Sequence, residues 1–465
     1  MPPFLTAAVL TCIQTKAEVM TDAVSSATRA TNRFDIYRAV WRWHFYAGLL
    51  VLPFLISLAV TGGLYLFRDE IDTFVHAELK SVVAQDTRTT PSAMIAAAVA
   101  AYPGTAVKFT DPATPRSSAE ITVQTQTGER RAVYVNPYTG EVLGSLPDRG
   151  TIMWTIRRLH SLKSFGPVAR GVIEIVGGWA ILLVATGLYL WWPRGRGSIP
   201  SIRGVPRQRV FWRDLHAATG LLAGGVIAFL AMTGIPWSGV WGAQVNQWAN
   251  GSNFGYPSGV RVNVPMSSEH LDHISPTTWS LEQARMPQSG EAASTPIGID
   301  EAVAIVDGLG LHRGYALALP TTPTGVYSAS VYPDDLSRQR VVHIDQYSGK
   351  PLIDMSYADY GPVGRALEWG INVHMGQQFG RINQFGLLAF CLLIIVLSVS
   401  AGAMWWKRRP RQALGVPPLP TKRSRIYGVA AILGLGGLLF PLTGASFLAI
   451  LLADYLLTKG MRQAA

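Results

Sequence analysis

Four apolar runs constrain this chain more than any other feature of its sequence. A helix needs about 20 apolar residues to cross the hydrocarbon layer of a bilayer, and each run is long enough. The sequence therefore predicts four spanning helices. A fifth stretch, 426–457, is long for one span and short for two, and Pro441 interrupts it, so it predicts a helix or, as we favour, a tight hairpin. The four runs extend over residues 43–67, 171–192, 216–240 and 384–406.

The composition agrees with a membrane protein and argues against other classes. Charged residues make up 15% of the 465 residues, against about 25% in soluble proteins, so a soluble enzyme is disfavoured. The net charge is +11, but the cations gather beside the apolar runs, which indicates membrane lipid rather than nucleic acid as the partner. Cys12 and Cys391 are the only cysteines, too few for a disulfide framework or a cysteine-based zinc or iron–sulfur site.

The short basic segments predict the orientation of the spans. Arg33, Arg38 and Arg42 precede the first span, and basic loops at 194–213 and 407–425 follow the second and fourth. Lys and Arg concentrate on the cytoplasmic side of membrane proteins, so these segments and the N-terminus are expected in the cytoplasm. The two long connections are then expected outside. In a bacterium the chain would be a multi-pass protein of the inner membrane, with these connections in the periplasm.

Both long connections have the composition of soluble α+β domains. Each has a helical stretch followed by alternating strand-like runs. Each also has a predicted hairpin, at 131–140 and 340–349, in which Asn or Asp opens the turn and Gly is suited to positive φ. The expected fold is therefore a mixed membrane protein, an α-helical transmembrane bundle with two duplicated periplasmic α+β domains.

The expected boundaries follow from these patterns. The cytoplasmic segments are 1–36, 194–212 and 407–425; the spans are 37–67, 166–193, 213–241 and 381–406; the outer domains are 68–165 and 242–380, with an insert at 256–296; the C-terminal hairpin or helix is 426–465.

An internal repeat links the spans to four histidines. His44 and His216 are each preceded by Trp-Arg, followed by Gly four residues later, and followed by Thr-Gly seventeen and eighteen residues later. His160 and His374 are each followed by Phe-Gly at five and six, by Thr or Ser at twenty-six, and by Trp-Trp at thirty-one and thirty-two. Matching offsets over such lengths indicate duplication of a helix, outer domain and helix.

The repeat places two histidines at each edge of the membrane, His44 with His216 on the cytoplasmic side and His160 with His374 on the outer side. Imidazole pairs on facing helices are suited to axial ligation of haem iron. Cationic side chains near them in sequence could bind the haem propionates: Arg42, Arg213, Arg157, Arg158 and Arg381. The sequence thus predicts two haem b groups and an electron path through the bilayer. The first span is about 36 Å long at 1.5 Å per residue, so haems at opposite edges would be far apart for electron exchange. Either the haems extend inward from their ligands, or aromatic residues bridge them, or the pairing differs.

Each of these features also has a structural explanation. A single His at a membrane edge is usually hydrogen-bonded and structural, and the duplicated register is what favours ligation. The paired tryptophans are expected as interfacial anchors and the Thr-Gly steps as helix-packing contacts. The segment Glu269 to His273 resembles a metal cluster, but its Pro/Ser-rich surroundings favour a solvated loop. Glu174 and Asp454 are acids at a membrane edge, either structural or proton-handling.

Several motifs of this chain together resemble one known family. They are residues 37–48 around His44, Thr61-Gly62-Gly63, the hairpin turn 135–140, residues 159–162 around His160, residues 212–216, and their second-copy counterparts. In these the chain resembles the PepSY-associated transmembrane family, often described as iron-regulated membrane proteins, over nearly its whole length from Tyr37 to about Tyr455. The extra C-terminal stretch and the insert at 256–296 depart from that pattern.

The resemblance implies an activity and a cofactor. Family members include inner-membrane ferric-siderophore reductases with PepSY-like periplasmic domains and haem b. By that similarity His44, His160, His216 and His374 would be haem ligands, and iron(III) bound to a siderophore or another ferric chelate would be reduced on the outer side. PepSY domains are also similar to peptidase propeptides, so the other implication is a haem-free anchor that binds or restrains a periplasmic peptidase.

The sequence has no nucleotide-binding motif of its own. It has no Gly-rich phosphate loop, no flavin or nicotinamide fingerprint and no nucleophile elbow in a strand context. We therefore expect electrons to come from a partner, either a quinol or a cytoplasmic reductase. The expected function is di-haem electron transfer to a periplasmic ferric chelate in iron acquisition.

Overall fold

The computed structural model describes residues 36–192, 201–249, 255, 266–270, 285–290, 295–410, 414–418, 420 and 424–463. Among them, four helices are long and apolar enough to cross a membrane, which confirms the number of main spans predicted from the sequence. They are Ile36–Tyr65, α6 (Pro167–Trp191), Arg209–Trp237, which contains α7 (Arg209–Gly234), and α11 (Gly380–Arg408). The N-terminal segment before residue 36 and most of the expected insert at 256–296 lie outside the described residues.

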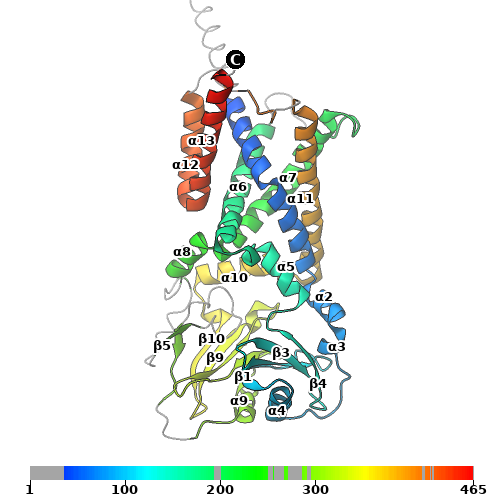
Figure 1. Ribbon diagram of the computed structural model, residues 1–465, viewed down its shortest axis with the longest axis vertical. Helices are drawn as coiled ribbons and strands as arrows, with labels where there is room; N and C mark the ends of the chain where they lie inside the picture. The colour runs from blue at the N-terminus through cyan, green and yellow to red at the C-terminus, as the bar shows by residue number, and fades with distance from the viewer. Residues whose placement is uncertain are drawn as a thin grey trace, which may run out of the picture. The chain divides into compact units, whose positions relative to one another are not determined.

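The chain divides into two compact units. The first unit takes its described residues from Met1–Ile56, Ile175–Ala231 and Leu393–Ala465, and the second from Ser57–Glu174 and Met232–Leu392. The first unit is therefore entirely helical over its described secondary structure. The second unit contains all the described strands, so each unit has its own architecture (Figure 1).

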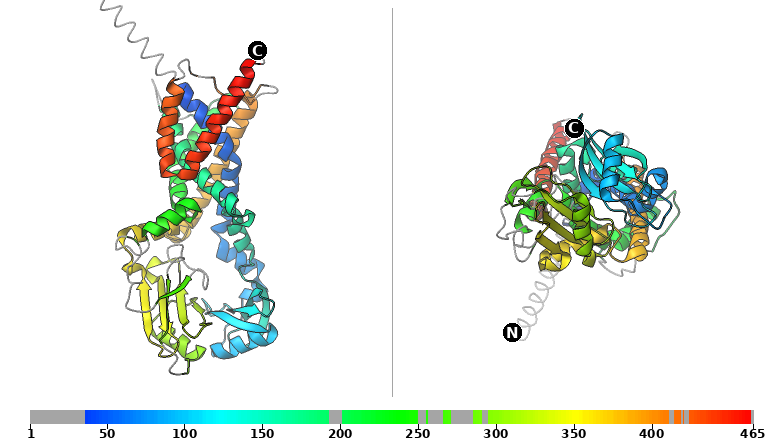
Figure 2. Two further views of the ribbon diagram at one scale, coloured as in Figure 1. Left: turned by 60° about the vertical axis from the view of Figure 1, so that its left-hand side comes forward. Right: turned by 90° about the horizontal axis from the view of Figure 1, so that it is seen from below.

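The C-terminal stretch forms two helices in the first unit. α12 (Ser424–Leu439) and α13 (Pro441–Gln463) are separated at Phe440 and pack side by side (Figures 1 and 2). The stacked rings of Trp43 and Phe447, with centroids 4.6 Å apart, attach α13 to the helix Ile36–Tyr65. Trp179 of α6 donates a hydrogen bond from Nε1 to Oγ of Ser446 at 2.8 Å. Aromatic burial and this bond therefore hold the hairpin against the spanning helices.

A single antiparallel sheet dominates the second unit. Its strands follow the order β10-β9-β8-β7-β1-β2-β3-β4, so the first outer segment supplies one half and the second outer segment the other. The halves meet where β1 pairs with β7 through Lys108↔Ala318, Phe109↔Leu317 and Thr110↔Ala316. The strands are β1 (Gly104–Thr110), β2 (Ala119–Thr125), β3 (Arg130–Val135), β4 (Val142–Pro147), β7 (Ala316–Ala318), β8 (Val326–Val331), β9 (Arg340–Asp345) and β10 (Pro351–Ser356).

Local turn chemistry explains the two predicted hairpins, which the structure confirms. Between β3 and β4, the side chain of Asn136 accepts from the backbone N–H of Tyr138, and Gly140 has φ of 72°. Between β9 and β10, Asp345 accepts from the backbone N–H of Tyr347, and Gly349 has φ of 67°. Asx-type bonds followed by a residue with positive φ close such turns. A separate two-stranded sheet pairs β5 (Met266–His270) with β6 (Arg285–Pro287).

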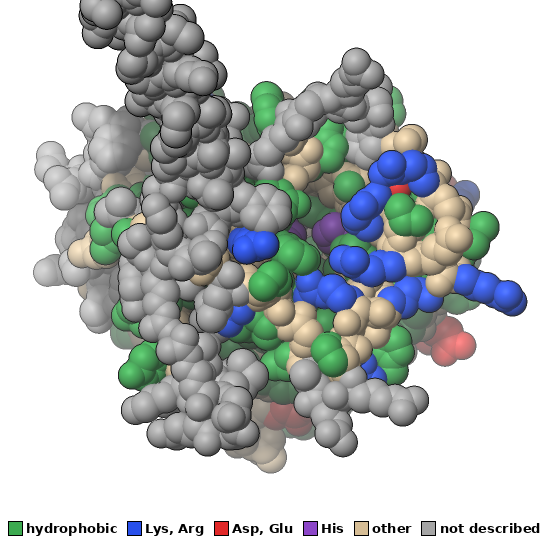
Figure 3. Space-filling view, turned by 90° about the horizontal axis from the view of Figure 1, so that it is seen from above, with side chains coloured by type: hydrophobic (Ala, Val, Ile, Leu, Met, Phe, Trp, Pro, Cys, Tyr) green, Lys and Arg blue, Asp and Glu red, His purple; other side chains and the backbone are tan. Residues whose placement is uncertain are grey.

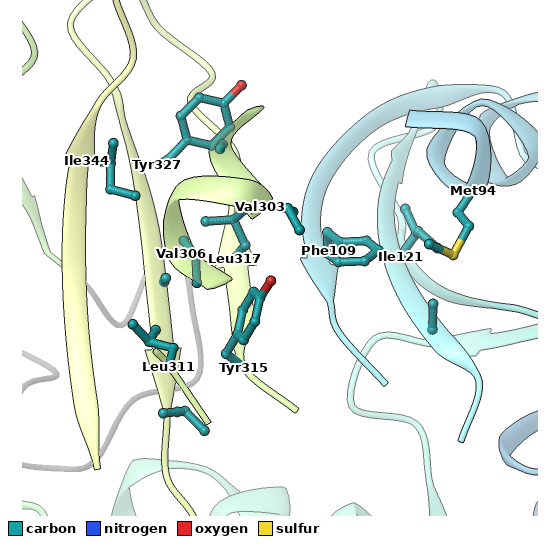
Figure 4. Packing of buried hydrophobic residues seen from close by; sticks show 14 of the residues in the cluster. Met94, Phe109, Ile121, Val303, Val306, Leu311, Tyr315, Leu317, Tyr327 and Ile344 are labelled. Carbon is teal, nitrogen blue, oxygen red and sulfur yellow. The ribbon is translucent and has the colours of Figure 1, made fainter. Parts of the chain in front are cut away.

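Two helices and one face of the large sheet form the main hydrophobic core. α4 (Pro91–Ala101) contributes Met94, and α9 (Ile299–Gly308) contributes Val306. Phe109 and Leu317, which face each other across the β1–β7 pairing, are 1% and 0% exposed. Figure 4 shows these side chains converging from both halves of the sheet. The two outer segments therefore share one core.

Shorter helices connect the sheet to the apolar helices within the second unit. α5 (Ile152–His160) and α10 (Pro362–His374) each end at a histidine. α2 (Arg68–Val75) and α3 (Ala77–Lys80) follow the helix Ile36–Tyr65 in sequence, and α8 (Val240–Ala249) follows α7. α5 and α10 are the elements that position the histidines described next.

Candidate functional site

The first unit contains a pair of adjacent histidines. His44 comes from the helix Ile36–Tyr65 and His216 from α7, and their ring centroids are 6.4 Å apart with ring planes at 81°. Nδ1 of His44 lies 2.9 Å from Oγ1 of Thr186 on α6. Nδ1 of His216 lies 3.2 Å from the carbonyl oxygen of Leu397 and 3.4 Å from Oγ of Ser400, both on α11. Each imidazole thus has a hydrogen-bond partner on a different helix.

The second unit contains a corresponding pair. His160 and His374, the last residues of α5 and α10, have ring centroids 6.5 Å apart and planes at 86°. Nδ1 of His160 lies 2.9 Å from Oγ1 of Thr61, and Nδ1 of His374 lies 2.8 Å from Oγ1 of Thr233. Ending at the histidine lets each short helix present its ring to a threonine of a longer one.

The threonine bonds determine which ring nitrogen carries the proton. Oγ1 of Thr61 lies 2.6 Å from the carbonyl oxygen of Ser57, a separation that requires the hydroxyl proton to lie between the two oxygens. The hydroxyl is then an acceptor toward His160, so Nδ1 donates and Nε2 keeps its lone pair. Thr186 bonds the carbonyl oxygen of Leu182 at 2.7 Å in the same way. A carbonyl cannot donate, so the Leu397 oxygen fixes the same tautomer for His216.

Glycines leave room for three of the four rings. A Cβ on Gly62 would lie 3.3 Å from Cε1 of His160, one on Gly187 3.3 Å from Cε1 of His44, and one on Gly234 3.4 Å from Cε1 of His374. Each of these glycines directly follows the threonine that bonds the same ring. The Thr-Gly dipeptide therefore supplies both a hydrogen-bond acceptor and a flat surface for one imidazole. At the fourth ring the dipeptide is Ser400-Ala401.

The geometry of each pair fits a metal bound between two imidazoles. Imidazole–metal bonds are about 2.0–2.1 Å long, and adding ring radii of about 1.1 Å places the centroids of two trans ligands about 6.3 Å apart. The observed separations are 6.4 and 6.5 Å. No group of three or more His, Cys, Asp or Glu side chains suited to a metal occurs among the residues that the structure describes. Further donors would come from a macrocycle, so the residues present fit a bis-imidazole haem.

Burial keeps the second pair uncharged. Desolvation lowers the pKa of His160 to about 4. Desolvation, and then the neighbouring His160, lower the pKa of His374 to about 3. Both rings belong to helices outside the four apolar ones, and at neutral pH both are neutral, the form in which imidazole binds metals.

Four of the five arginines expected near the histidines have protein partners in the described structure, and among them Arg381 pairs with Glu70. Arg42 donates to the carbonyl oxygen of Pro417 at 2.6 Å, and Arg213 pairs with the buried Asp214 at 2.7 Å. The guanidinium of Arg157 lies 4.7 Å from the ring centroid of Trp154. Arg158 is on the last turn of α5. Figure 3 shows Lys and Arg side chains on one face around a hollow in which a histidine is visible.

Glu174 is a further buried acid of the second unit. Its Oε2 accepts from the Ser238 hydroxyl at 2.8 Å and from the backbone N–H groups of Val240 and Trp241, both at 3.1 Å. It therefore caps the beginning of α8 from another helix, although its Oε1 is buried with no hydrogen-bond partner in the described structure. The side chains of the suspected cluster Glu269 to His273, and that of Asp454, lie outside what the structure describes.

The comparison with family models decides the relationship of the chain. The model described as the PepSY-associated TM region matches residues 41–408. The chain belongs to this family. The matched region includes all four histidines and the whole large sheet, whereas α12 and α13 of this PepSY-associated TM protein lie after it. A search of curated proteins finds no match.

The threonine partners of the histidines are the residues that sequence reasoning missed. The Thr-Gly steps were expected as packing contacts, but their hydroxyls bond imidazoles. The repeat contained a signal. Thr61 and Thr233 each follow the histidine of their own span, His44 or His216, by seventeen residues, and Thr186 and Ser400 follow His160 and His374 by twenty-six. The offsets, however, relate residues along one segment of the chain. The hydrogen bonds instead join residues that are far apart in the sequence, 99 positions for Thr61 and His160 and 141 to 184 positions for the other three pairs.

Proposed function

We propose that this protein is a di-haem b electron-transfer protein of the bacterial inner membrane. It takes electrons from a quinol or a cytoplasmic reductase and reduces a periplasmic acceptor, a ferric chelate such as an iron(III) siderophore, in iron acquisition. The N-terminus and the basic loops lie in the cytoplasm and the sheet domain, built from two duplicated PepSY-like halves, in the periplasm. The observation that carries this proposal is the pair of 6.4 and 6.5 Å imidazole separations.

Each histidine pair would hold one haem through its two imidazoles. A haem b bound there would supply one-electron oxidation and reduction. His44 and His216 would hold one group in the first unit, and His160 and His374 the other in the second. Because the Nδ1 atoms are engaged with hydroxyl or carbonyl oxygens, Nε2 is the nitrogen that each ring would offer to the iron. Desolvation lowers the pKa of both histidines of the second pair, which keeps these imidazoles neutral at pH 7.

A cavity in the second unit supports the position of the acceptor. It has a volume of about 200 Å³ and lies beside α5, with both signs of charge on its walls. One wall is Arg149, a non-glycine residue with φ of 56°, whose guanidinium lies 5.4 Å from the ring centroid of Trp154. Backbone strain of this kind often marks ligand sites. Trp154 and His160 are separated by about 9 Å along the axis of α5, a short path for an electron.

A reduced-minus-oxidised visible spectrum tests the proposal most directly. The detergent-purified protein and its four His→Ala variants would be compared, with haem quantified as the pyridine haemochrome. We expect two low-spin b-type haems, with His44→Ala and His216→Ala losing one and His160→Ala and His374→Ala losing the other. A colourless protein from haem-replete cells would contradict the proposal and favour a haem-free anchor that binds a periplasmic peptidase.

A further inference from the structure

We propose that Thr61, Thr186 and Thr233 are positioning residues that lock the haem-ligating imidazoles in the Nδ1–H tautomer and lower the potential of the bound haem. The inference rests on the proposed function and deepens it. It starts from a feature that the four rings share, a short contact from Nδ1 to an oxygen of another element.

The hydroxyl groups act as relays toward the helix backbone. Thr61 donates to the carbonyl oxygen of Ser57 and accepts from His160, so the imidazole proton has one permitted position. Thr186 does the same between Leu182 and His44. A hydroxyl that is polarised by donating is a better acceptor, so the bond from Nδ1 is strengthened. A ring that donates from Nδ1 gives more electron density to a metal on Nε2 and favours the oxidised iron.

The four sites are not equivalent, and the difference lies at one ring. His216 faces the carbonyl oxygen of Leu397 at 3.2 Å, and Ser400 is 3.4 Å away because its hydroxyl donates to that same carbonyl at 2.7 Å. His160 and His374 instead have two matched threonine bonds of 2.9 and 2.8 Å. The longer bond at His216 is weaker. The first-unit haem therefore has one strongly and one weakly bonded ligand, whereas the second-unit haem has two strong ones, which gives the two haems different potentials.

Valine substitution removes the acceptor while keeping the shape of the side chain. In Thr61→Val or Thr233→Val the Nδ1–H group loses its hydroxyl acceptor. We expect haem affinity of that pair to fall about 10–100-fold. In the haem that still binds, the ratio of reduced to oxidised iron at a given potential should rise about tenfold, which is a rise of about 59 mV in the reduction potential of a one-electron couple. Thr61→Ser should restore both values, because the hydroxyl returns.

Thr219→Val is the matched control. Thr219 is buried on α7 and its Oγ1 bonds the carbonyl oxygens of Leu215 at 2.8 Å and of His216 at 3.3 Å, but its described bonds include no imidazole nitrogen. Its substitution removes the same kind of intrahelical bond and should leave both haems unchanged. A potential shift in Thr219→Val as large as that in Thr61→Val would overturn the inference, as would an unshifted Thr61→Val that binds its haem normally.

A second readout does not depend on haem. In haem-free protein with ¹⁵N-labelled histidine, solid-state NMR distinguishes protonated from unprotonated Nδ1. We expect the wild type to show Nδ1–H for the four paired rings and Thr61→Val to lose that preference at His160. Unprotonated Nδ1 in the wild type refutes the threonine lock whether or not haem binds. A wild type without haem but with Nδ1–H refutes the proposed function and supports the lock.

Discussion

Nδ1 of His160 lies 2.9 Å from Oγ1 of Thr61, a residue 99 positions earlier in the chain. The next residue, Gly62, would place a Cβ 3.3 Å from Cε1 of the same ring. One dipeptide of an apolar helix therefore both bonds the imidazole and makes space for it. The same arrangement occurs at Thr186-Gly187 and Thr233-Gly234, so the histidines are held by a repeated device rather than by unrelated contacts.

The glycine in this device can be tested by adding one methyl group. In Gly62→Ala the new Cβ would lie 3.3 Å from Cε1 of His160, so the ring must shift by a few tenths of an ångström, at a cost of about 1 kcal/mol, the low end for overpacking. A loss of 1.4 kcal/mol of binding free energy lowers an affinity about tenfold, so we expect the affinity of the His160–His374 pair for haem to fall several-fold. Haem titration of the apoprotein measures this directly. Gly225→Ala is the control, because a Cβ there meets nothing within 4 Å among the described residues; equal losses in both variants would rule out the crowding argument.

The structural features that were predicted correctly from the sequence depend on interactions between residues close together in the chain. The hairpins at Asn136–Gly140 and Asp345–Gly349 are closed by side-chain bonds two residues away and by a glycine with positive φ. The spanning helices follow from apolar length alone. These features need no knowledge of the rest of the fold, because every interaction that determines them lies within a few residues.

The features that could not be predicted depend on long-range packing. Two separate outer domains were expected, but β1 and β7 join both outer segments in one sheet through three residue pairs from Lys108↔Ala318 to Thr110↔Ala316. No turn connects these strands. The Thr61–His160 bond likewise depends on how α5 packs against a distant helix. Offsets in the sequence identified the recurring residues, but not which of them touch.

The shared core can be tested at the junction of the two sheet halves. Phe109 is 1% exposed and lies opposite Leu317 across the β1–β7 pairing. Phe109→Ala should lower the free energy of unfolding of the sheet by about 3–5 kcal/mol, the usual cost of deleting a buried phenyl group. Hydrogen exchange should accelerate in strands of both halves. Val83→Ala is the control and should have little effect, because this side chain is 80% exposed. If Phe109→Ala accelerated hydrogen exchange only in β1–β4, the two halves of the sheet would be independent.

Substitution of Arg149, the strained residue of the cavity, should change acceptor binding without lowering the stability of the fold. Arg149 has φ of 56°, which Asn and Gly tolerate better, so Arg149→Asn should leave the stability of the second unit unchanged or raise it by up to about 1 kcal/mol. Loss of the guanidinium should raise KM for a ferric chelate several-fold with little change in kcat. Steady-state reduction kinetics measure both. Arg116→Asn, at another exposed arginine, serves as the control; an unchanged KM in Arg149→Asn would remove this cavity as the acceptor site.

The capping carboxylate of α8 predicts a difference between two substitutions. Glu174→Ala leaves the Ser238 hydroxyl and two backbone N–H groups without their acceptor, so α8 should fray and its amides exchange faster. Loss of such a cap costs about 0.5–2 kcal/mol. Glu174→Gln keeps a carbonyl oxygen to accept these bonds and should protect α8 nearly as well as the wild type. Equal fraying in both variants would mean that the negative charge, not the acceptor, stabilises the helix.

His343 predicts how the sheet responds to acid. It is 2% exposed on β9, its Nδ1 lies 2.9 Å from Oγ of Ser328, and burial lowers its pKa from 6.5 to about 4. The folded state therefore resists a proton that the unfolded chain accepts. Stability is unaffected above pH 6.5 and falls as the pH decreases from 6.5 toward 4, by about 3 kcal/mol in all for this group.

Hydrogen exchange of the backbone amides of β8 and β9 at pH 7 and pH 5, corrected for the intrinsic exchange rate, measures this loss of stability. His343→Gln removes the titrating group, so its stability should depend less on pH than that of the wild type, although it is lower at pH 7 because the packing changes. A His343→Gln profile that is parallel to the wild type between pH 7 and 5 would assign the acid sensitivity of the sheet to other groups.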